Sequence, residues 1–167
     1  MNDLKIEAEG DRSIRMTRTF HAPRTAVYAA WTQPELVRRW LLGPGNDWSM
    51  PICDIDLRVG GEYRYVWRNA ANGAEMGMGG EFVEIDPPAR IIATERFDES
   101  WYPGSAFVST EFAEAAGETT LTQRVTYDSA DARDGVLRSP MESGVGAGYD
   151  RLEVLLADRN SGLSDHG

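Results

Sequence analysis

The chain has 167 residues and a formal net charge of −10, because 17 lysines and arginines stand against 27 aspartates and glutamates. An acidic chain repels polyanions unless its basic residues cluster, and here they are scattered, which argues against nucleic acid and anionic membranes as partners. The length suits one domain with a sizeable core, and no apolar run approaches the roughly 18 residues that span a bilayer. We therefore expect a globular protein without membrane insertion.

The opening segment, MNDLKIEAEG, has neither the basic region nor the apolar core of a secretory signal, so we expect a cytoplasmic protein. We expect residues 1–12 to be a flexible N-terminus, 13–158 to be a single domain and 159–167 to be a disordered tail. The single cysteine, Cys53, has no partner for a disulfide or a thiolate zinc site, and we expect a small buried apolar residue there.

The first predicted elements are one strand and two short helices. Residues 13–20, SIRMTRTF, alternate between two faces, which predicts a strand with one polar residue, Arg18, on its apolar side. A helix is predicted from Pro23 to Trp31, since proline suits the first helical position. Pro34 then begins a second helix whose apolar residues are spaced for a buried face.

The middle of the chain predicts an antiparallel meander, because short alternating segments are separated by turns rich in glycine, proline and asparagine. The predicted strands are residues 52–58, 63–67, 76–85, 91–97, 107–112 and 119–127. Turns are expected between them, and a loop at 43–47 precedes the first strand of this set.

A long helix is predicted near the end of the chain. Ser139 fits the cap of a capping box, with Glu142 positioned to reach back to it. Apolar residues then recur at helical spacing to about Ala157, which gives a helix on the order of 27 Å long. Residues 129–136 are expected to add a short helical segment before it.

The order of these elements and four blocks of sequence resemble the START-like (SRPBCC) superfamily. The blocks FHAPRTAVYAAWTQPELVRRW, DLRVGGEYRYVWR, GEFVEIDPPARIIATERF and MESGVGAGYDRLEVLLA are similar to the family named for the activator of heat-shock-protein-90 ATPase, in its small bacterial form. This resemblance covers Ile14 to Ala157. It implies an α+β helix-grip fold, in which a curved antiparallel sheet wraps a long C-terminal helix around a cavity that commonly takes hydrophobic ligands.

One difference from the family bears on function. The eukaryotic activator that names the family has a further N-terminal domain that makes much of the chaperone contact, and the short segment before Ile14 does not supply it. We therefore do not expect chaperone activation from the resemblance alone.

The segment RVGGEYRYVWR, residues 58–68, carries aromatic residues on alternate positions with arginines between them. Such a pattern can stack the bases of single-stranded nucleic acid, but the net charge argues against that function. We interpret Tyr63, Tyr65 and Trp67 as one wall of the cavity, with the charged residues on the solvent face. The alternative is that these aromatics fill the core and leave no ligand space.

Two further residues bear on the choice between a cavity and a filled core. Gly148 lies on the predicted buried face of the long helix, where it indicates either a void or close packing. Glu95 shares strand parity with Ile91, Ala93 and Phe97, so its carboxyl is expected on the apolar side. We hypothesise that Glu95 holds a polar end of a ligand; the alternative is that it pairs with an arginine at the rim or points outward from a bulge.

The full set of predicted cavity residues follows from these arguments and from the expected positions of the capping segments. It comprises Trp40, Trp48, Tyr63, Tyr65, Trp67, Met78, Glu95, Trp101, Met141, Val145, Gly148, Tyr149 and Leu152. Methionine and tryptophan suit such a lining because methionine adapts to irregular shapes. Loops 43–49 and 99–104 are the predicted entrance.

Catalytic and metal-binding motifs are scarce. Only two histidines occur, His21 and His166, and no motif has metal-ligand spacing, so we expect neither a metal site nor a cofactor. There is also no nucleophile elbow of the GxSxG type and no phosphate-binding glycine loop. Glu95 is the one candidate catalytic residue.

We favour a non-catalytic protein that binds a small hydrophobic or amphipathic molecule, such as a lipid, in stress response. The first alternative is a cyclase, dehydratase or hydrolase related to the polyketide cyclases of the superfamily, with Glu95 as acid/base and Tyr65 or Tyr149 as hydrogen-bond donor. The second alternative is a co-chaperone-like interaction protein. Either a monomer or a homodimer fits the sequence.

Overall fold

The computed structural model of the chain describes residues 4–43, 45–98, 105–139 and 141–166. Eight strands and four helices lie in this described part. In chain order they are β1 (Lys5–Glu9), β2 (Ser13–Phe20), α1 (Arg24–Thr32), α2 (Pro34–Trp40), β3 (Trp48–Ile55), β4 (Glu62–Asn69), β5 (Glu75–Asp86), β6 (Arg90–Phe97), β7 (Ala106–Ala115), β8 (Glu118–Thr126), α3 (Ala130–Arg138) and α4 (Met141–His166).

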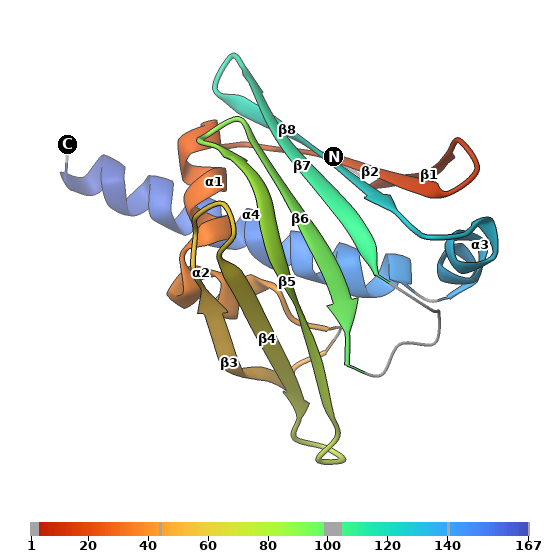
Figure 1. Cartoon of the computed structure of the whole chain (residues 1–167). Coiled ribbons are helices and arrows are strands. Elements are labelled where there is room, and N and C mark those ends of the chain that lie inside the picture. Colours follow the sequence, from red (N-terminus) through yellow and green to blue (C-terminus); the bar gives the residue numbers. More distant parts are fainter. Residues whose placement is uncertain (1–3, 44, 99–104, 140, 167) are drawn as a thin grey trace.

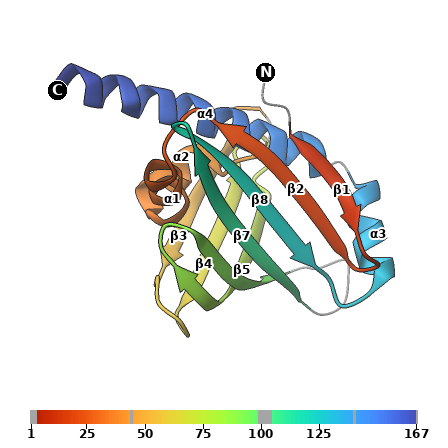
Figure 2. The same ribbon diagram turned by 90° about the horizontal axis from the view of Figure 1, so that it is seen from above.

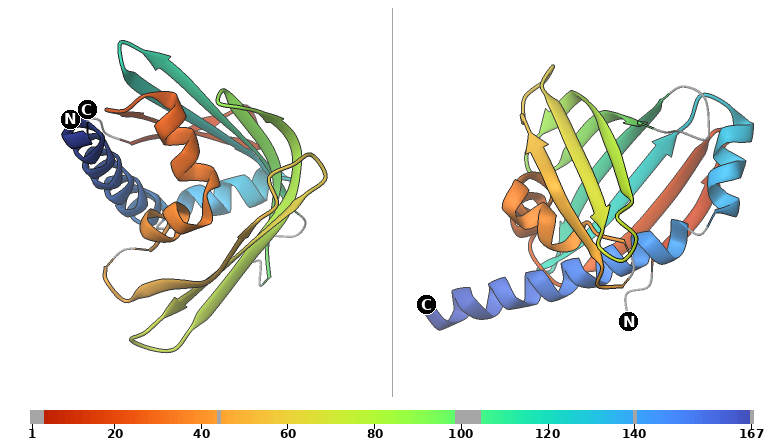
Figure 3. Two further views of the ribbon diagram at one scale, coloured as in Figure 1. Left: turned by 90° about the vertical axis from the view of Figure 1, so that its left-hand side faces the viewer. Right: turned by 90° about the horizontal axis from the view of Figure 1, so that it is seen from below.

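The strands form one antiparallel sheet in the order β1-β2-β8-β7-β6-β5-β4-β3. The sheet is strongly curved, and α4 runs across its concave side, with α1 and α2 next to it (Figures 1 and 3). The predicted α+β fold, a curved sheet around a long C-terminal helix, is confirmed. None of the helices in the described residues combines the length and apolar composition needed to cross a membrane.

The N-terminal elements largely follow their predictions. Along β2, buried positions alternate with half-buried ones through its whole length, from Ser13 to Phe20. Pro23 is the N-cap of α1 rather than its first residue, and Pro34 begins α2 as predicted. Trp40 closes α2 and is almost fully buried, while its indole Nε1 donates to the Ala30 carbonyl at 2.9 Å.

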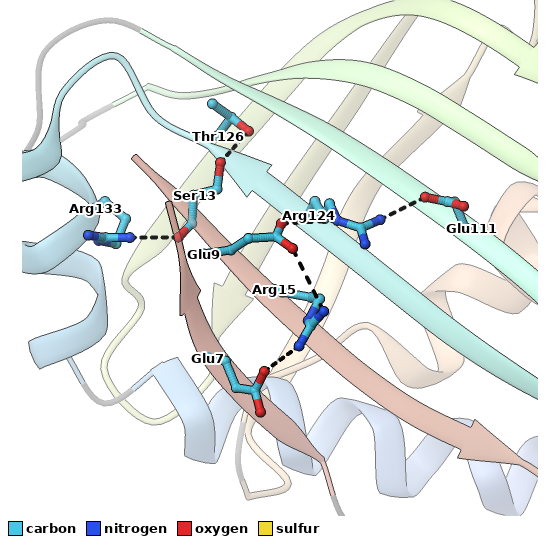
Figure 4. A network of polar contacts seen from close by, with 8 residues as sticks. All are labelled: Glu7, Glu9, Ser13, Arg15, Glu111, Arg124, Thr126 and Arg133. Atoms are coloured by element: carbon cyan, nitrogen blue, oxygen red, sulfur yellow. Dashed lines mark hydrogen bonds and ion pairs between the residues drawn. The ribbon is translucent and has the colours of Figure 1, made fainter. Parts of the chain in front are cut away.

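The prediction of a flexible N-terminus at residues 1–12 is wrong for β1, because Lys5–Glu9 pairs with β2 along its whole length. Side chains on the outer face of the sheet strengthen this pairing (Figure 4). Arg15 contacts Glu7 at 2.5 Å and Glu9 at 3.7 Å, and Arg124 contacts Glu9 at 3.0 Å. Arg124 also reaches Glu111 on β7 at 2.8 Å. This charge ladder, Glu7-Arg15-Glu9-Arg124-Glu111, joins strands β1, β2, β8 and β7.

The predicted strand 52–58 is shifted toward the N-terminus in the structure. β3 begins at Trp48 and ends at Ile55, with a change of register between Ser49 and Ile52. Residues 56–61 form a tight turn instead, in which the Gly61 amide donates to the Arg58 carbonyl at 2.8 Å. Gly60 has φ +84°, a left-handed conformation that suits glycine, and this turn ends the strand.

Ser139, the predicted cap of the long helix, takes part in the end of the helix before it. Ser139 closes α3, because its hydroxyl donates to the Val136 carbonyl. The preceding helix, α3, is capped at its start by Ser129, whose hydroxyl accepts from the Ala132 amide at 3.0 Å. Pro140 and the side chain of Glu142 lie outside the described residues, so the capping box stays a prediction.

The final helix is longer than predicted. It runs to His166, so residues 159–166, for which we predicted disorder, are helical, and this end extends past the sheet (Figures 2 and 3). The prediction stopped near Ala157 because the apolar spacing ends there. No proline follows to break the helix, and polar residues are compatible with a helix end that faces solvent.

Two apolar clusters lie on the concave side. The larger one packs α1, α2 and α4 onto the sheet, and it includes Phe20, Trp40 and Leu152. The smaller one packs α3 onto β2, β7 and β8, around Ile14 and Val125. The space between the strands and α4 that these clusters leave open is the site described below.

Candidate functional site

A cavity of about 650 Å³ lies between the concave face of the sheet and α4. Its wall takes side chains from α1, α2, α3, α4 and from the strands β2 to β8. Ten of the predicted cavity residues line it: Trp40, Trp48, Tyr63, Tyr65, Trp67, Met78, Glu95, Val145, Gly148 and Tyr149. The aromatic side chains thus enclose space rather than fill it.

Three predicted residues are not placed in this lining. Leu152 is fully buried in the larger apolar cluster, where it packs the helix onto the sheet beside the cavity. Trp101 lies outside the described residues, together with the predicted entrance loop 99–104, and so does the side chain of Met141. Met76, which is partly exposed at the rim, lines the cavity as well.

The aromatic wall on β4 has the predicted alternation. Tyr63, Tyr65 and Trp67 are buried, and neighbouring ring centroids are 5.1 Å and 5.9 Å apart. The Trp67 indole donates to the Leu41 carbonyl at 2.7 Å, which ties β4 to the segment after α2. Between these residues, Arg64 points to the outer face and pairs with Asp98, and this contact lowers the pKa of the Asp98 carboxyl.

Tyr63 lies across the neighbouring strand because that strand carries a glycine at the facing position. Tyr63 pairs with Gly80 of β5, and a Cβ at Gly80 would lie 2.9 Å from the Tyr63 ring and 1.9 Å from the Thr94 carbonyl oxygen. The Tyr63 hydroxyl therefore reaches β6, where it donates to that carbonyl at 2.6 Å. Sequence analysis missed Gly80, although the run MGMGG in a strand is a signal for close backbone approach.

Glu95 faces the cavity, as its strand parity predicted. Its pKa is raised to about 7, because burial in the apolar site disfavours the charged carboxylate. Within the described residues, no hydrogen bond joins the carboxyl to another group. Tyr65 lies close enough to interact with Glu95 electrostatically. Burial is the largest cause that raises the pKa of the Tyr65 hydroxyl, and the nearby Cys53 and Glu95 raise it further. Neither rim pairing nor an outward bulge accounts for this carboxyl.

A second polar group lines the cavity farther along the sheet. The Tyr149 hydroxyl donates to Oε1 of Gln123 at 3.2 Å, and the Gln123 amide nitrogen donates to the Thr110 hydroxyl at 3.2 Å. Sequence analysis missed Thr110 and Gln123. The signal was strand parity, since Thr110 lies between Val108 and Phe112 on the inward face of β7.

The helix α4 approaches the end of α2 closely at Gly148. A Cβ at that position would lie 3.2 Å from the Trp40 carbonyl oxygen, so close packing is a reason for glycine here, while Gly148 also lines the cavity. One turn later, Arg151 donates to the Leu42 and Gly43 carbonyls at 3.1 Å and 2.9 Å. These contacts hold the start of the predicted entrance loop 43–49 against the helix.

A second hollow, of about 1080 Å³, lies on the outer face of β3 to β6 and is open to solvent. Half of its lining residues are charged, and several of these charges pair with one another, such as Arg64 with Asp98 and Arg58 with Asp56. Charges that are already paired in water offer little to a ligand. The enclosed apolar cavity is therefore the candidate site.

The described residues hold no group of three or more histidine, cysteine, aspartate or glutamate side chains that could bind a metal ion. Cys53 is buried, and its thiol donates to the Pro34 carbonyl at 3.7 Å. Burial is the main cause that raises the pKa of this thiol. It behaves as a small apolar residue next to the cavity wall.

A curved sheet that grips a long C-terminal helix over an apolar cavity defines the START-like class of proteins. Residues 21–157 match the family described as "Activator of Hsp90 ATPase homolog 1-like protein". The chain belongs to this family. A comparison with curated proteins gave no match.

Solved structures with the same fold include proteins from bacteria and one from a eukaryotic parasite. A crystal structure of a Rhodobacter sphaeroides protein is 30% identical, has a TM-score of 0.87, and the match covers 93% of this chain and 99% of that one. A Nitrosomonas europaea protein is 23% identical, with a TM-score of 0.79 and coverage of 92% and 99%. An HSP90 activator from Plasmodium falciparum is 22% identical, with a TM-score of 0.51 and coverage of 69% and 72%.

Proposed function

We propose that the protein binds a small hydrophobic or amphipathic molecule in the cavity between the sheet and α4. The observation that carries this proposal is an apolar cavity of about 650 Å³ with an aromatic wall on β4, within the roughly 300–1,000 Å³ range of small-molecule sites. Its few polar groups suit such a site as well, because polar groups fix the orientation of a ligand. A cytoplasmic location stays a prediction from the sequence.

A reaction in the same cavity is the second candidate. The observation in its favour is Glu95, since a carboxyl with a pKa of about 7 is suited to exchange protons near neutral pH. Tyr65 next to it supplies a hydroxyl for hydrogen bonding. An enzyme of this kind would bind its substrate as proposed here, so ligand binding is the first property to test.

A chaperone-facing role rests on the family description and on the printed title of the Plasmodium falciparum structure. The identity of 22% to that structure supports a shared fold and carries no further argument. We keep this role as an alternative to small-molecule binding.

The proposal is tested by identifying small molecules that co-purify with the protein and by closing the cavity. Val108 lies on the cavity wall, so Val108→Trp places a large side chain in the ligand space. Phe107, the neighbouring residue on β7, is 52% exposed on the outer face, and Phe107→Trp is the matched control. We expect the wild type and Phe107→Trp to carry the same bound molecule by native mass spectrometry, and Val108→Trp to lose it.

Circular dichroism and thermal unfolding establish that both variants fold, since overpacking a core costs about 1–3 kcal/mol. Wild type that carries no small molecule from its own cells contradicts the proposal. A folded Val108→Trp variant that keeps the molecule contradicts the cavity as its site.

A further inference from the structure

The cavity wall carries one formal charge. Among the lining residues that the structure describes, Glu95 is the sole charged side chain, and the others are apolar, aromatic or neutral polar. The Glu95 side chain is half-buried on this wall. A carboxylate that is partly removed from water without a partner destabilises the fold, and a neutral residue in its place would remove that cost. Among the described residues, no protein cation compensates Glu95, which leaves this carboxyl available to a cationic group of a ligand.

Aromatic rings stand beside this carboxyl. Tyr63 donates its hydroxyl to the Thr94 carbonyl, which belongs to the peptide group joining Thr94 to Glu95. Tyr65 interacts with Glu95 electrostatically, and the rings of Tyr63 and Tyr65 are 5.1 Å apart. Rings of this kind attract a cation placed over their faces, and the attraction grows when the cation is removed from water.

The titratable groups around Glu95 leave its charge uncompensated at neutral pH. Those that line the cavity with it in the described structure are Tyr63 and Tyr65 on β4, Tyr127 after β8 and Tyr149 on α4. Cys53 on β3 lies near Tyr65, and Arg18 on β2 pairs with Asp150 of α4. Tyrosines and a buried thiol are neutral near pH 7.

The net charge of the protein also favours a cationic ligand over an anionic one. At −10, the chain attracts cations and repels anions. An anionic ligand such as a fatty acid would meet this field outside and the Glu95 carboxylate inside. A cationic ligand would gain from both.

The register of the sheet fixes the distance to the second polar group. Glu95 faces Ala106 on β7, whereas Thr110 faces Ile91, four residues away along β6. At about 3.3 Å per residue, the two positions lie roughly 13 Å apart. Between them, Ala93 and Val108 form an apolar floor.

We propose that the ligand is an amphipathic amine, whose ammonium group pairs with Glu95 beside the rings of Tyr63 and Tyr65. Its aromatic or alicyclic body lies along β6 and β7, and a hydrogen-bonding group at its far end reaches Thr110 and Gln123. This proposal rests on the binding function proposed above and names the chemical class of the ligand.

Three matched probes test the ammonium group by isothermal titration calorimetry: naphthylmethylamine, naphthylmethanol and naphthylacetate, which are cationic, neutral and anionic near pH 7. A charge-assisted hydrogen bond supports a preference of about tenfold or more for the amine over the alcohol, with the anion weakest. Because the amine pairs with the ionised carboxylate, its affinity should rise about tenfold from pH 6 to pH 8, while that of the alcohol changes little.

In Glu95→Gln, the alcohol should bind as in the wild type, and the preference for the amine and its pH dependence should both disappear. Glu81→Gln is the matched control, because it removes the same charge from an exposed position on β5 and should keep the preference. It separates the contact at Glu95 from general attraction by the net charge.

The outcomes distinguish the two proposals. An alcohol that binds the wild type as tightly as the amine, or a preference that survives Glu95→Gln, overturns the amine and leaves the binding function standing. If no probe binds while a neutral or anionic molecule co-purifies, the amine is again excluded. If no probe binds and nothing co-purifies, both proposals fail together.

Discussion

The two halves of the sheet are built differently. Strands β1, β2, β8 and β7 pair without any change of register, and the charge ladder from Glu7 to Glu111 runs across their outer face. In the other half, the register shifts between β3 and β4 and between β5 and β6. Bulges of this kind redirect side chains and bend strands. The regular half thus provides a frame, and the irregular half shapes the cavity.

Within the irregular half, Gly80 is the position where we expect a substitution to reduce stability most. In Gly80→Ala, the new Cβ would lie 1.9 Å from the Thr94 carbonyl oxygen, so the backbone of β5 or β6 must move and Tyr63 must leave its place. We expect a loss of about 3 kcal/mol in the free energy of unfolding, measured by urea denaturation.

Gly146→Ala is the control for this prediction. A Cβ there meets nothing within 4 Å, and alanine favours a helix over glycine by about 1 kcal/mol, so this variant should be more stable than the wild type. Equal stability of Gly80→Ala and the wild type would show that the two strands are not in close contact.

The Glu95 carboxyl on the cavity wall should lower the stability of the folded protein at neutral pH. Its pKa is about 7 in the folded protein against an ordinary 4.5, so the folded state holds the proton more tightly, and stability falls as pH rises between these values and is constant above them. Glutamine is neutral throughout. We therefore expect Glu95→Gln to gain about 2 kcal/mol relative to the wild type between pH 5 and pH 8.

The measurement is urea denaturation of both proteins across this pH range. Glu81→Gln, at an exposed position, should show no such gain. A constant difference between Glu95→Gln and the wild type at all pH values would mean that the Glu95 carboxyl is not desolvated.

The charge ladder of the regular half should matter least for stability. Arg124 is 38% exposed and contacts Glu9 and Glu111, and exposed ion pairs contribute about 0–1 kcal/mol. We expect Arg124→Gln to cost less than about 1 kcal/mol and the cost to vanish in 1 M salt, because salt screens exposed charges. A larger cost that persists in salt would indicate that Arg124 acts through packing.

The sequence predicted the elements whose apolar residues are periodic. β2 alternates along its whole length, and Glu95 was placed correctly by parity within β6. β1 was missed because Lys5–Glu9 has no buried residue, so nothing in its pattern separates it from a flexible segment. The strand forms because it pairs with the free edge of β2. That edge is present only once the sheet has assembled.

The contacts that shape the cavity depend on the register between strands, which a single segment does not contain. Tyr63 was predicted to face inward, but its contact with Thr94 requires β4, β5 and β6 to place Gly80 between them. The pairing of Gln123 with Thr110 likewise joins neighbouring strands of the finished sheet. Periodicity indicates which face a residue occupies, and the pairing of strands decides what it touches there.

The pairing of β2 with β8 also has a consequence for how the chain is made. Ser13 and Thr126 bond through their hydroxyls at 2.8 Å, although 113 positions separate them in the chain. During synthesis, the inner edge of β2 stays open until β8 has left the ribosome, whereas each strand from β4 to β7 pairs with the strand made just before it. We expect the closure of this long loop to be the slowest step in folding. The cavity is complete only after this step, when α4 packs onto the sheet.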